Sequence, residues 1–169
     1  DLDPLAMMPL RELHLAYCPA TNLEPLRDRP LQTLTIAYAP VENLEPLTGA
    51  PLANLKLSGT RIKNLAPLTK MPLRTLHLDR TPVTDLKPLA GLPLRELRLD
   101  GCENLRDLSP LAQCTQLETL TLPRNHGNIE FLKNLPNLKR LSYFYDTKNP
   151  AKVEPATQFW RTRAIASRR

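Results

Sequence analysis

Histidine and cysteine, the side chains that most often bind transition metals, are sparse in this chain and widely spaced. His14 and His77 lie 63 residues apart, which is three times a 21-residue interval that recurs along the sequence. If each interval contributes one strand, three strand spacings of ~4.8 Å place the two histidines about 14 Å apart. Zinc ligands lie about 2.0–2.3 Å from the metal, so one ion cannot bind both. We therefore expect no metal site, and three cysteines, an odd number, form no disulfide framework.

Two aspartates, Asp79 and Asp100, have a spacing that raises the question of acid–base or cation chemistry. They are 21 residues apart, so neighbouring strands would bring their carboxylates within about 5 Å of each other. That separation is compatible with a general acid–base pair or a cation site. The surrounding charges alternate in sign, which favours a salt-bridge ladder on an open, wet surface: His77, Arg80, Glu96 and Arg98. Because catalysis needs a pocket that excludes water, we predict that the chain is not an enzyme and has no cofactor.

Internal repeats produce this interval and must form the elements that position these side chains. Units of 21 residues follow one another from Pro9, and a fifth unit, which begins at Pro93, has one extra residue. Each unit contains L-x-x-L-x-L, and the alternation at its end is that of a strand. Each unit also contains [N/D]-L-x-P-L, in which Asn or Asp can cap a short helical turn and proline sets its first dihedral angle. One unit cannot bury its leucines alone, but stacked units can.

We therefore predict an α/β solenoid with a parallel concave sheet of about seven short strands and short helical turns or loops on the convex side. Each leucine buried in the stack contributes roughly 1.5–3 kcal/mol. The repeat resembles the leucine-rich-repeat family, in particular the short bacterial internalin-like type with an Asp-Leu-Ser-Pro-Leu turn, which is found here at residues 107–111. This resemblance covers about residues 1–146 and implies the leucine-rich-repeat horseshoe.

A second resemblance concerns the C-terminal part. The segment LPRNHGNIEFLKNLPNLKRLSY and the residues after it are similar to the end of leucine-rich-repeat regions attached to certain bacterial serine/threonine protein kinases. This implies a sensor or regulatory segment of a signalling protein whose catalytic domain lies upstream. The stretch itself contains no Gly-rich phosphate loop, H-R-D or D-F-G motif, so we do not expect kinase activity in these residues.

The chain divides into three expected parts. Residues 1–146 form the solenoid of about seven rungs, residues 147–160 form a C-terminal cap with Phe159 and Trp160, and residues 161–169 form a basic tail without fixed structure. Because Asp1 to Leu5 already read as an [N/D]-L-x-P-L turn, the sequence begins in the middle of a repeat. We expect further repeats or a cap upstream, since an open end exposes the leucine column. An exposed end also allows a dimer.

Charge and hydropathy argue against two classes of partner. The formal net charge is +6, and four of the positive charges are the arginines after Trp160, which leaves the repeats near +2. We therefore expect no nucleic acid partner. No apolar run approaches the ~18 residues of a membrane span, and no signal-peptide pattern occurs, so we expect no membrane as a partner. The compartment stays open, with the cytoplasm slightly favoured.

The strand side chains between the leucines are expected to form columns on the concave face, one residue per rung. Tyr17 and Tyr38 stack on neighbouring rungs at one edge, and tyrosine is enriched at binding hot spots. The alternative is that they pack on each other and on upstream repeats. The centre of the face carries mixed charges and is the expected partner contact, with a solvated face as the alternative: Lys56, His77, Asp79, Arg80, Glu96, Arg98 and Asp100.

The function predicted from these features is protein–protein interaction through the concave face. The alternative is the regulatory segment of a bacterial serine/threonine kinase, which is compatible with the first. A featureless concave face would have favoured a structural spacer, but this face varies in chemistry from rung to rung.

Overall fold

The computed structural model describes residues 2–144 and 154–166, and it describes side chains as far as residue 163. Strands of three residues recur along the chain: β1 (Glu12–His14), β2 (Thr33–Thr35), β3 (Asn54–Lys56), β4 (Thr75–His77), β5 (Glu96–Arg98), β6 (Thr119–Thr121) and β7 (Arg140–Ser142). A 3-10 turn precedes each strand: η1 (Asp3–Leu5), η2 (Glu24–Leu26), η3 (Glu45–Leu47), η4 (Ala66–Leu68), η5 (Lys87–Leu89), η6 (Ser109–Gln113) and η7 (Glu130–Asn134). The helix α1 (Ala156–Ala166) follows β7.

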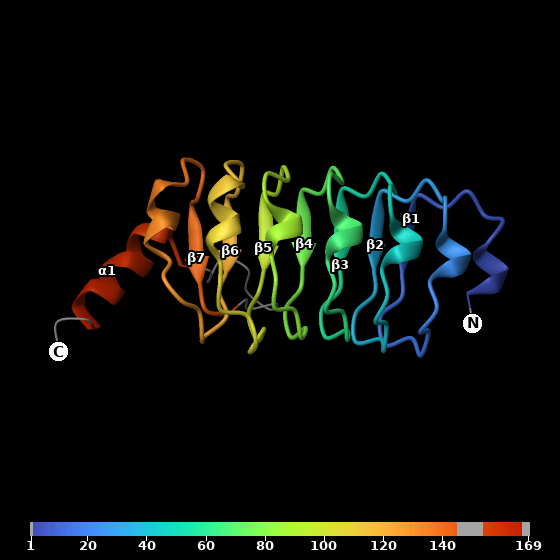
Figure 1. Cartoon of the computed structure of the whole chain (residues 1–169), viewed down its shortest axis with the longest axis horizontal. Coiled ribbons are helices and arrows are strands. Elements are labelled where there is room, and N and C mark those ends of the chain that lie inside the picture. The colour runs from blue at the N-terminus through green and yellow to red at the C-terminus, as the bar shows by residue number, and fades with distance from the viewer. Residues whose placement is uncertain (1, 145–153, 167–169) are drawn as a thin grey trace.

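The strands form one seven-stranded parallel sheet whose order is the order of the sequence, from β1 to β7 (Figure 1). Leu13 pairs with Leu34 and Leu34 with Leu55, so each strand advances by one repeat without slipping. The 3-10 turns form a second row along the sheet (Figure 1). The predicted solenoid with a parallel sheet of seven short strands is confirmed.

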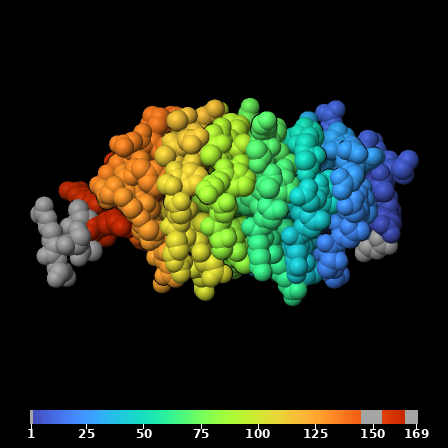
Figure 2. All heavy atoms as spheres, viewed as in Figure 1, coloured from blue at the N-terminus to red at the C-terminus, as the bar shows by residue number. Residues whose placement is uncertain are grey.

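The leucines are buried between the sheet and the row of turns. Leu55 and Leu76 on the strands and Leu47 and Leu68 on the turns are all 0% exposed. In the space-filling view the rungs follow one another as slabs in contact along the length of the molecule (Figure 2). Coverage is lower at the N-terminal end, where Leu13 is only partly buried. The continuous leucine column therefore holds the sheet rigid, which fixes the side chains on its outer face.

The Asn or Asp of each [N/D]-L-x-P-L segment organises the turn that follows. The side-chain Oδ1 of Asn43 accepts a hydrogen bond from the backbone N–H of Glu45 at 2.9 Å, and Oδ1 of Asp85 accepts one from Lys87 at 2.8 Å. The same bond occurs before η2, η4, η6 and η7. The expected cap is therefore present as an Asx turn that begins two residues before the 3-10 segment.

The segment around α1 covers the free edge of β7. The backbone N–H of Leu141 donates to the carbonyl of Glu154 at 3.0 Å, and Arg140 forms an antiparallel bridge with Pro155. Phe159 is 5% exposed, and its ring centroid lies 5.3 Å from that of Tyr143. An exposed strand edge is thus replaced by a paired and partly apolar end.

The expectation of an unstructured tail over residues 161–169 does not hold for residues 161–166, which form the second half of α1. Alanine and arginine favour helix. Phe159 anchors the helix, and Nη1 of Arg163 donates a hydrogen bond to Tyr143 Oη at 3.0 Å. The remaining parts of the expected cap and tail, residues 147–153 and 167–169, lie outside the described residues. No helix in the described part of the chain is long and apolar enough to cross a bilayer.

Candidate partner-binding face

The outer, concave face of the sheet carries the side chains that alternate with the core leucines. The register places Lys56, His77 and Arg98 in one column and Thr75 and Glu96 in a neighbouring column. Asp79 and Asp100 follow their strands by the same number of residues, and so do Tyr17, Tyr38 and Arg80 one position later. The predicted site residues therefore occupy the columns expected for them.

Glu96 links two side chains at the centre of this face, because it accepts a hydrogen bond from each of them. Its Oε1 accepts from His77 Nε2 at 2.9 Å and from Arg98 Nε at 2.9 Å. The side chains of His77, Arg98 and Glu96 are 5%, 14% and 30% exposed. The centre is thus less open than expected, because His77 lies in its column between the long side chains of Lys56 and Arg98.

Burial and hydrogen bonding set the charges of this cluster. Burial lowers the pKa of His77 below its ordinary value of 6.5. The hydrogen bond from His77, assisted by that from Arg98, lowers the pKa of Glu96 from 4.5 to about 2. A neutral His77 with its proton on Nε2 therefore donates to a charged Glu96, which is also paired with Arg98. The cluster is a rigid, hydrogen-bonded patch at neutral pH.

Asp79 and Asp100 each accept a hydrogen bond from a hydroxyl group on a neighbouring rung. Ser58 Oγ donates to Asp79 Oδ1 at 2.7 Å, and Thr121 Oγ1 donates to Asp100 Oδ1 at 2.7 Å. Each aspartate thus accepts its hydrogen bond from the side that faces away from the other aspartate: Ser58 lies one rung before Asp79, and Thr121 lies one rung after Asp100. Within residues 2–144 and 154–166, no group of three or more His, Cys, Asp and Glu side chains could hold a metal ion.

One edge of the face is formed by five residues at equivalent positions just after the strands, and we call them the rim: Tyr17, Tyr38, Gly59, Arg80 and Gly101. All five have left-handed backbone angles, with φ of 56°, 55°, 67°, 58° and 76° in that order. Glycine adopts this conformation at no steric cost, whereas a residue with a side chain is disfavoured there by about 1 kcal/mol. The two tyrosines and the arginine therefore occupy the rim at some cost in stability.

The rim side chains pack along the solenoid axis. The Tyr17 and Tyr38 rings are stacked with centroids 5.0 Å apart and planes inclined by 6°. A Cβ on Gly59 would lie 2.6 Å from Cδ1 of Tyr38, and a Cβ on Gly101 would lie 2.9 Å from Cγ of Arg80. The glycines thus leave room for the tyrosine ring and the arginine stem, and they hold both in place.

Arg80 closes the rim by reaching back to Tyr38. Its Nη1 donates a hydrogen bond to Tyr38 Oη at 2.9 Å. The predicted ladder of alternating charge therefore does not continue through Arg80, which has no carboxylate within ion-pair distance among the described residues. Beyond Gly101, a hollow of about 320 Å³ is lined by residues that follow β5, β6 and β7: Gly101, Cys102, Glu103, Arg124, Asn125 and Tyr143.

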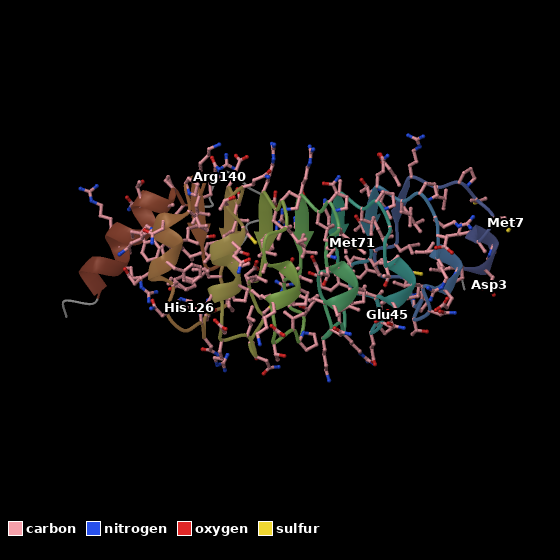
Figure 3. The ribbon with its side chains drawn as sticks, turned by 45° about the horizontal axis from the view of Figure 1, so that its top comes forward. Asp3, Met7, Glu45, Met71, His126 and Arg140 are labelled. Atoms are coloured by element: carbon pink, nitrogen blue, oxygen red, sulfur yellow. The ribbon has the colours of Figure 1, made fainter. Side chains whose placement is uncertain are left out.

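Sequence reasoning missed several residues that shape this site. Gly59 and Gly101 make room for the rim, and Ser58 and Thr121 hold the aspartates. A signal for the glycines was present, because two glycines at the register position of Tyr17, Tyr38 and Arg80 indicate a left-handed backbone there. A further cluster lies at the C-terminal end, where His126 stacks on Tyr143 with centroids 5.7 Å apart beside α1 (Figure 3).

Comparisons with known proteins agree on the fold. No protein family model matches the chain, and no curated protein matches it significantly. Among solved structures, an internalin C2 from Listeria monocytogenes is 29% identical, with a TM-score of 0.72 over 86% of this chain and 68% of that chain. An internalin F from the same organism is 23% identical, with a TM-score of 0.66 over 91% of this chain and 56% of that chain.

Proposed function

We propose that this chain, a leucine-rich-repeat solenoid with an internalin-like fold, is a protein-binding module that contacts its partner through the concave face and the rim. The interface residues of this proposal are the nine predicted from the sequence: Tyr17, Tyr38, Lys56, His77, Asp79, Arg80, Glu96, Arg98 and Asp100.

The observation that carries this proposal is the arrangement of Tyr17, Tyr38 and Arg80 in left-handed backbone. Backbone conformations that disfavour a side chain cluster at ligand-binding sites in proteins. Tyrosine and arginine are also the residue types that dominate binding hot spots. Tyr17 is 76% exposed and Tyr38 is 41% exposed, yet their rings are already stacked. A partner would therefore meet a large surface that loses little conformational entropy on binding.

The same observation separates a binding module from a structural spacer. A spacer needs only the leucine column and the turns, and glycine at each rim position would serve it with less strain. The polar side chains of the face are also held by one another, as Glu96 is by His77 and Arg98. Such preorganisation favours recognition of a defined partner.

An enzymatic role has no comparable support. The candidate carboxylates Asp79 and Asp100 are bound to the hydroxyl groups of Ser58 and Thr121 on an open sheet face. Catalysis relies on groups that converge on a site from which water is excluded. We therefore propose a non-catalytic role.

The regulatory-segment alternative rests on the resemblance of the C-terminal part to kinase-associated repeats. No observation on the described residues favours it over a free-standing module, so it stays a prediction. The dimer through the N-terminal end also stays a prediction.

The test is affinity capture with the immobilised full chain and a bacterial lysate, followed by mass spectrometry of the retained proteins. Thr33→Arg with Thr75→Arg places two bulky charges on the concave face. The matched control, Thr48→Arg with Thr69→Arg, places the same charges on the exposed turn side.

A protein retained by the unmodified chain and by the turn-side control, but lost by the concave-face variant, is the expected result. Circular dichroism of all three chains checks that each is folded. Retention by the concave-face variant and loss by the turn-side control would move the interface to the convex side and contradict the proposal.

A further inference from the structure

We propose that the rim, together with Arg124, binds an extended acidic segment of the protein partner. This inference rests on the proposed function and deepens it by naming the chemistry of the bound segment. Its basis is a guanidinium group that the fold positions and that no carboxylate of the described residues neutralises.

Arg80 is exposed, and its positive charge has no carboxylate partner among the described residues. Its acceptor, Tyr38 Oη, is a neutral hydroxyl 2.9 Å from Nη1. Asp79, the residue before Arg80, accepts a hydrogen bond from Ser58, which lies on the preceding rung. A guanidinium carries five N–H donors, and the bond to Tyr38 uses one of them. The other donors of Arg80 can bind a carboxylate through two parallel hydrogen bonds.

Arg124 provides a second positive charge along the same line. It follows β6 at the position that Arg80 has after β4, and it is exposed beside the hollow of about 320 Å³ that also contains Gly101. Two strand spacings of ~4.8 Å separate the rungs of the two arginines by about 10 Å. A peptide in the polyproline II conformation rises ~3.1 Å per residue with three residues per turn, so acidic residues three positions apart lie about 9 Å apart on one side of it and match this separation.

The tyrosine pair supplies the apolar part of the site. The flat outer surface of Tyr17 and the exposed edge of Tyr38 can be covered by a proline, aliphatic or aromatic side chain of the bound segment. Because the rings are fixed by stacking and by Gly59, this contact requires little ordering. The bound segment is thus expected to combine an apolar residue with acidic residues.

A nucleic acid fits this surface less well than an acidic peptide. Bases bind single-stranded nucleic acid sites by stacking on open aromatic faces. Here Tyr17 and Tyr38 stack on each other and Tyr38 also packs against Gly59, so the pair offers one open ring face, that of Tyr17, and no row of faces for successive bases. Asp79 and Asp100 directly precede the rim residues Arg80 and Gly101, and their carboxylates would repel a continuous line of phosphates. Isolated carboxylates on a peptide avoid that repulsion.

The experiment is selection of a phage-displayed library of random twelve-residue peptides on the immobilised full chain. The selected peptides are then synthesised with a fluorescent label, and their affinity is measured by anisotropy. We expect enrichment of Asp or Glu close to an apolar residue. Arg80→Gln should weaken binding by about tenfold or more, because it removes a charge-assisted hydrogen bond. Arg124→Gln should weaken it by a smaller factor.

The matched control is Arg61→Gln, which removes an exposed arginine that is not a rim residue and that pairs with Glu42. This variant should bind within about twofold of the unmodified chain. Arg80→Lys keeps the positive charge but loses the planar guanidinium, so its affinity should lie between those of Arg80→Gln and the unmodified chain.

Several outcomes would overturn the inference: no enrichment, enrichment of peptides without acidic residues, unchanged affinity in Arg80→Gln, or displacement of the peptide by a twelve-residue oligothymidine. These outcomes are separate from failure of the proposed function, because the concave-face variant Thr33→Arg with Thr75→Arg leaves every rim residue in place. Binding of a lysate protein that is indifferent to Arg80 would support the module and reject the acidic segment.

Discussion

Arg80 and Tyr38 are 42 residues apart in sequence, yet Nη1 of the arginine donates a hydrogen bond to the tyrosine hydroxyl at 2.9 Å. The repeat makes this contact possible, because it places both residues at the same position two rungs apart and leaves only a glycine between them. The contact orients a positive charge, which no carboxylate in the described part of the chain pairs with, next to two stacked aromatic rings. Preorganisation of this kind is the feature on which the proposed binding role depends.

The first prediction tests that orientation. Tyr38→Phe keeps the stacked ring and removes the acceptor of Arg80. We expect affinity for a selected acidic peptide to fall by about threefold to tenfold, since one exposed hydrogen bond is worth about 1 kcal/mol. The free energy of unfolding in urea should change by less than about 1 kcal/mol. Affinity equal to that of the unmodified chain would show that the contact does not prepare Arg80 for binding.

The second prediction compares two glycines with similar backbone angles. Gly59 has φ of +67° and Gly49 has φ of +77°. A Cβ at Gly59 would lie 2.6 Å from Tyr38, whereas a Cβ at Gly49 has no atom within 4 Å. Gly49→Ala should cost about 1 kcal/mol from backbone strain alone. Gly59→Ala should cost about 1–3 kcal/mol more because Tyr38 must move. Equal costs in urea denaturation would contradict the packing described for the rim.

The third prediction concerns acid. The pKa of His77 is lowered by burial from 6.5, and that of Glu96 is lowered to about 2 from 4.5. A group with a lowered pKa in the folded state stabilises the fold above its unfolded pKa, and this stability is lost as the pH falls. The free energy of unfolding should therefore decrease below pH 6.5 because of His77, and again from about 4.5 towards about 2 because of Glu96.

Urea denaturation at a series of pH values measures this dependence. The second decrease should amount to on the order of 2–3 kcal/mol. Glu96→Gln should be less stable at pH 7 and should lack much of that decrease, because it has no carboxylate to protonate. An identical pH profile for the variant would mean that Glu96 is not held by His77 and Arg98 as described.

The fourth prediction concerns the cap. Phe159 is 5% exposed and packs on Tyr143, so Phe159→Ala should lower the free energy of unfolding by about 3 kcal/mol. Thr162→Ala, on the exposed side of the same helix, should change it by less than about 0.5 kcal/mol. Amide hydrogen exchange at Leu141 and Ala156 should speed up in the first variant only, since both donate the bonds that join β7 to the capping segment. An equal decrease in the free energy of unfolding in both variants would argue against the cap.

The fold could be predicted in detail because the same local pattern recurs with one spacing. Leu34, Leu55 and Leu76 must be buried together once a strand is placed in each repeat. The columns of the concave face follow from the same register, and the stacking of Tyr17 on Tyr38 follows from neighbouring rungs. These features depend on backbone periodicity, which a sequence displays directly.

Side-chain direction was not predictable in the same way. Arg80 points back to Tyr38 and not to Asp79, and this choice depends on the left-handed backbone and on the space above Gly59. The burial of His77 depends on the lengths of Lys56 and Arg98 beside it. The helix over residues 161–166 was missed because its stability comes from docking of Phe159 and Arg163 on the last rung, and no repeat signals that contact.

The proposed function requires that a protein partner binds on the concave side of the sheet. The most direct measurement places a photo-crosslinking amino acid at Thr75 on β4 in one chain and at the exposed turn residue Thr69 in another, and exposes each to the same lysate under light. We predict a discrete covalent protein adduct from position 75 that disappears when Arg80→Gln is added, and none from position 69. An adduct formed from position 69 alone, or no adduct from position 75, would contradict binding through the concave face.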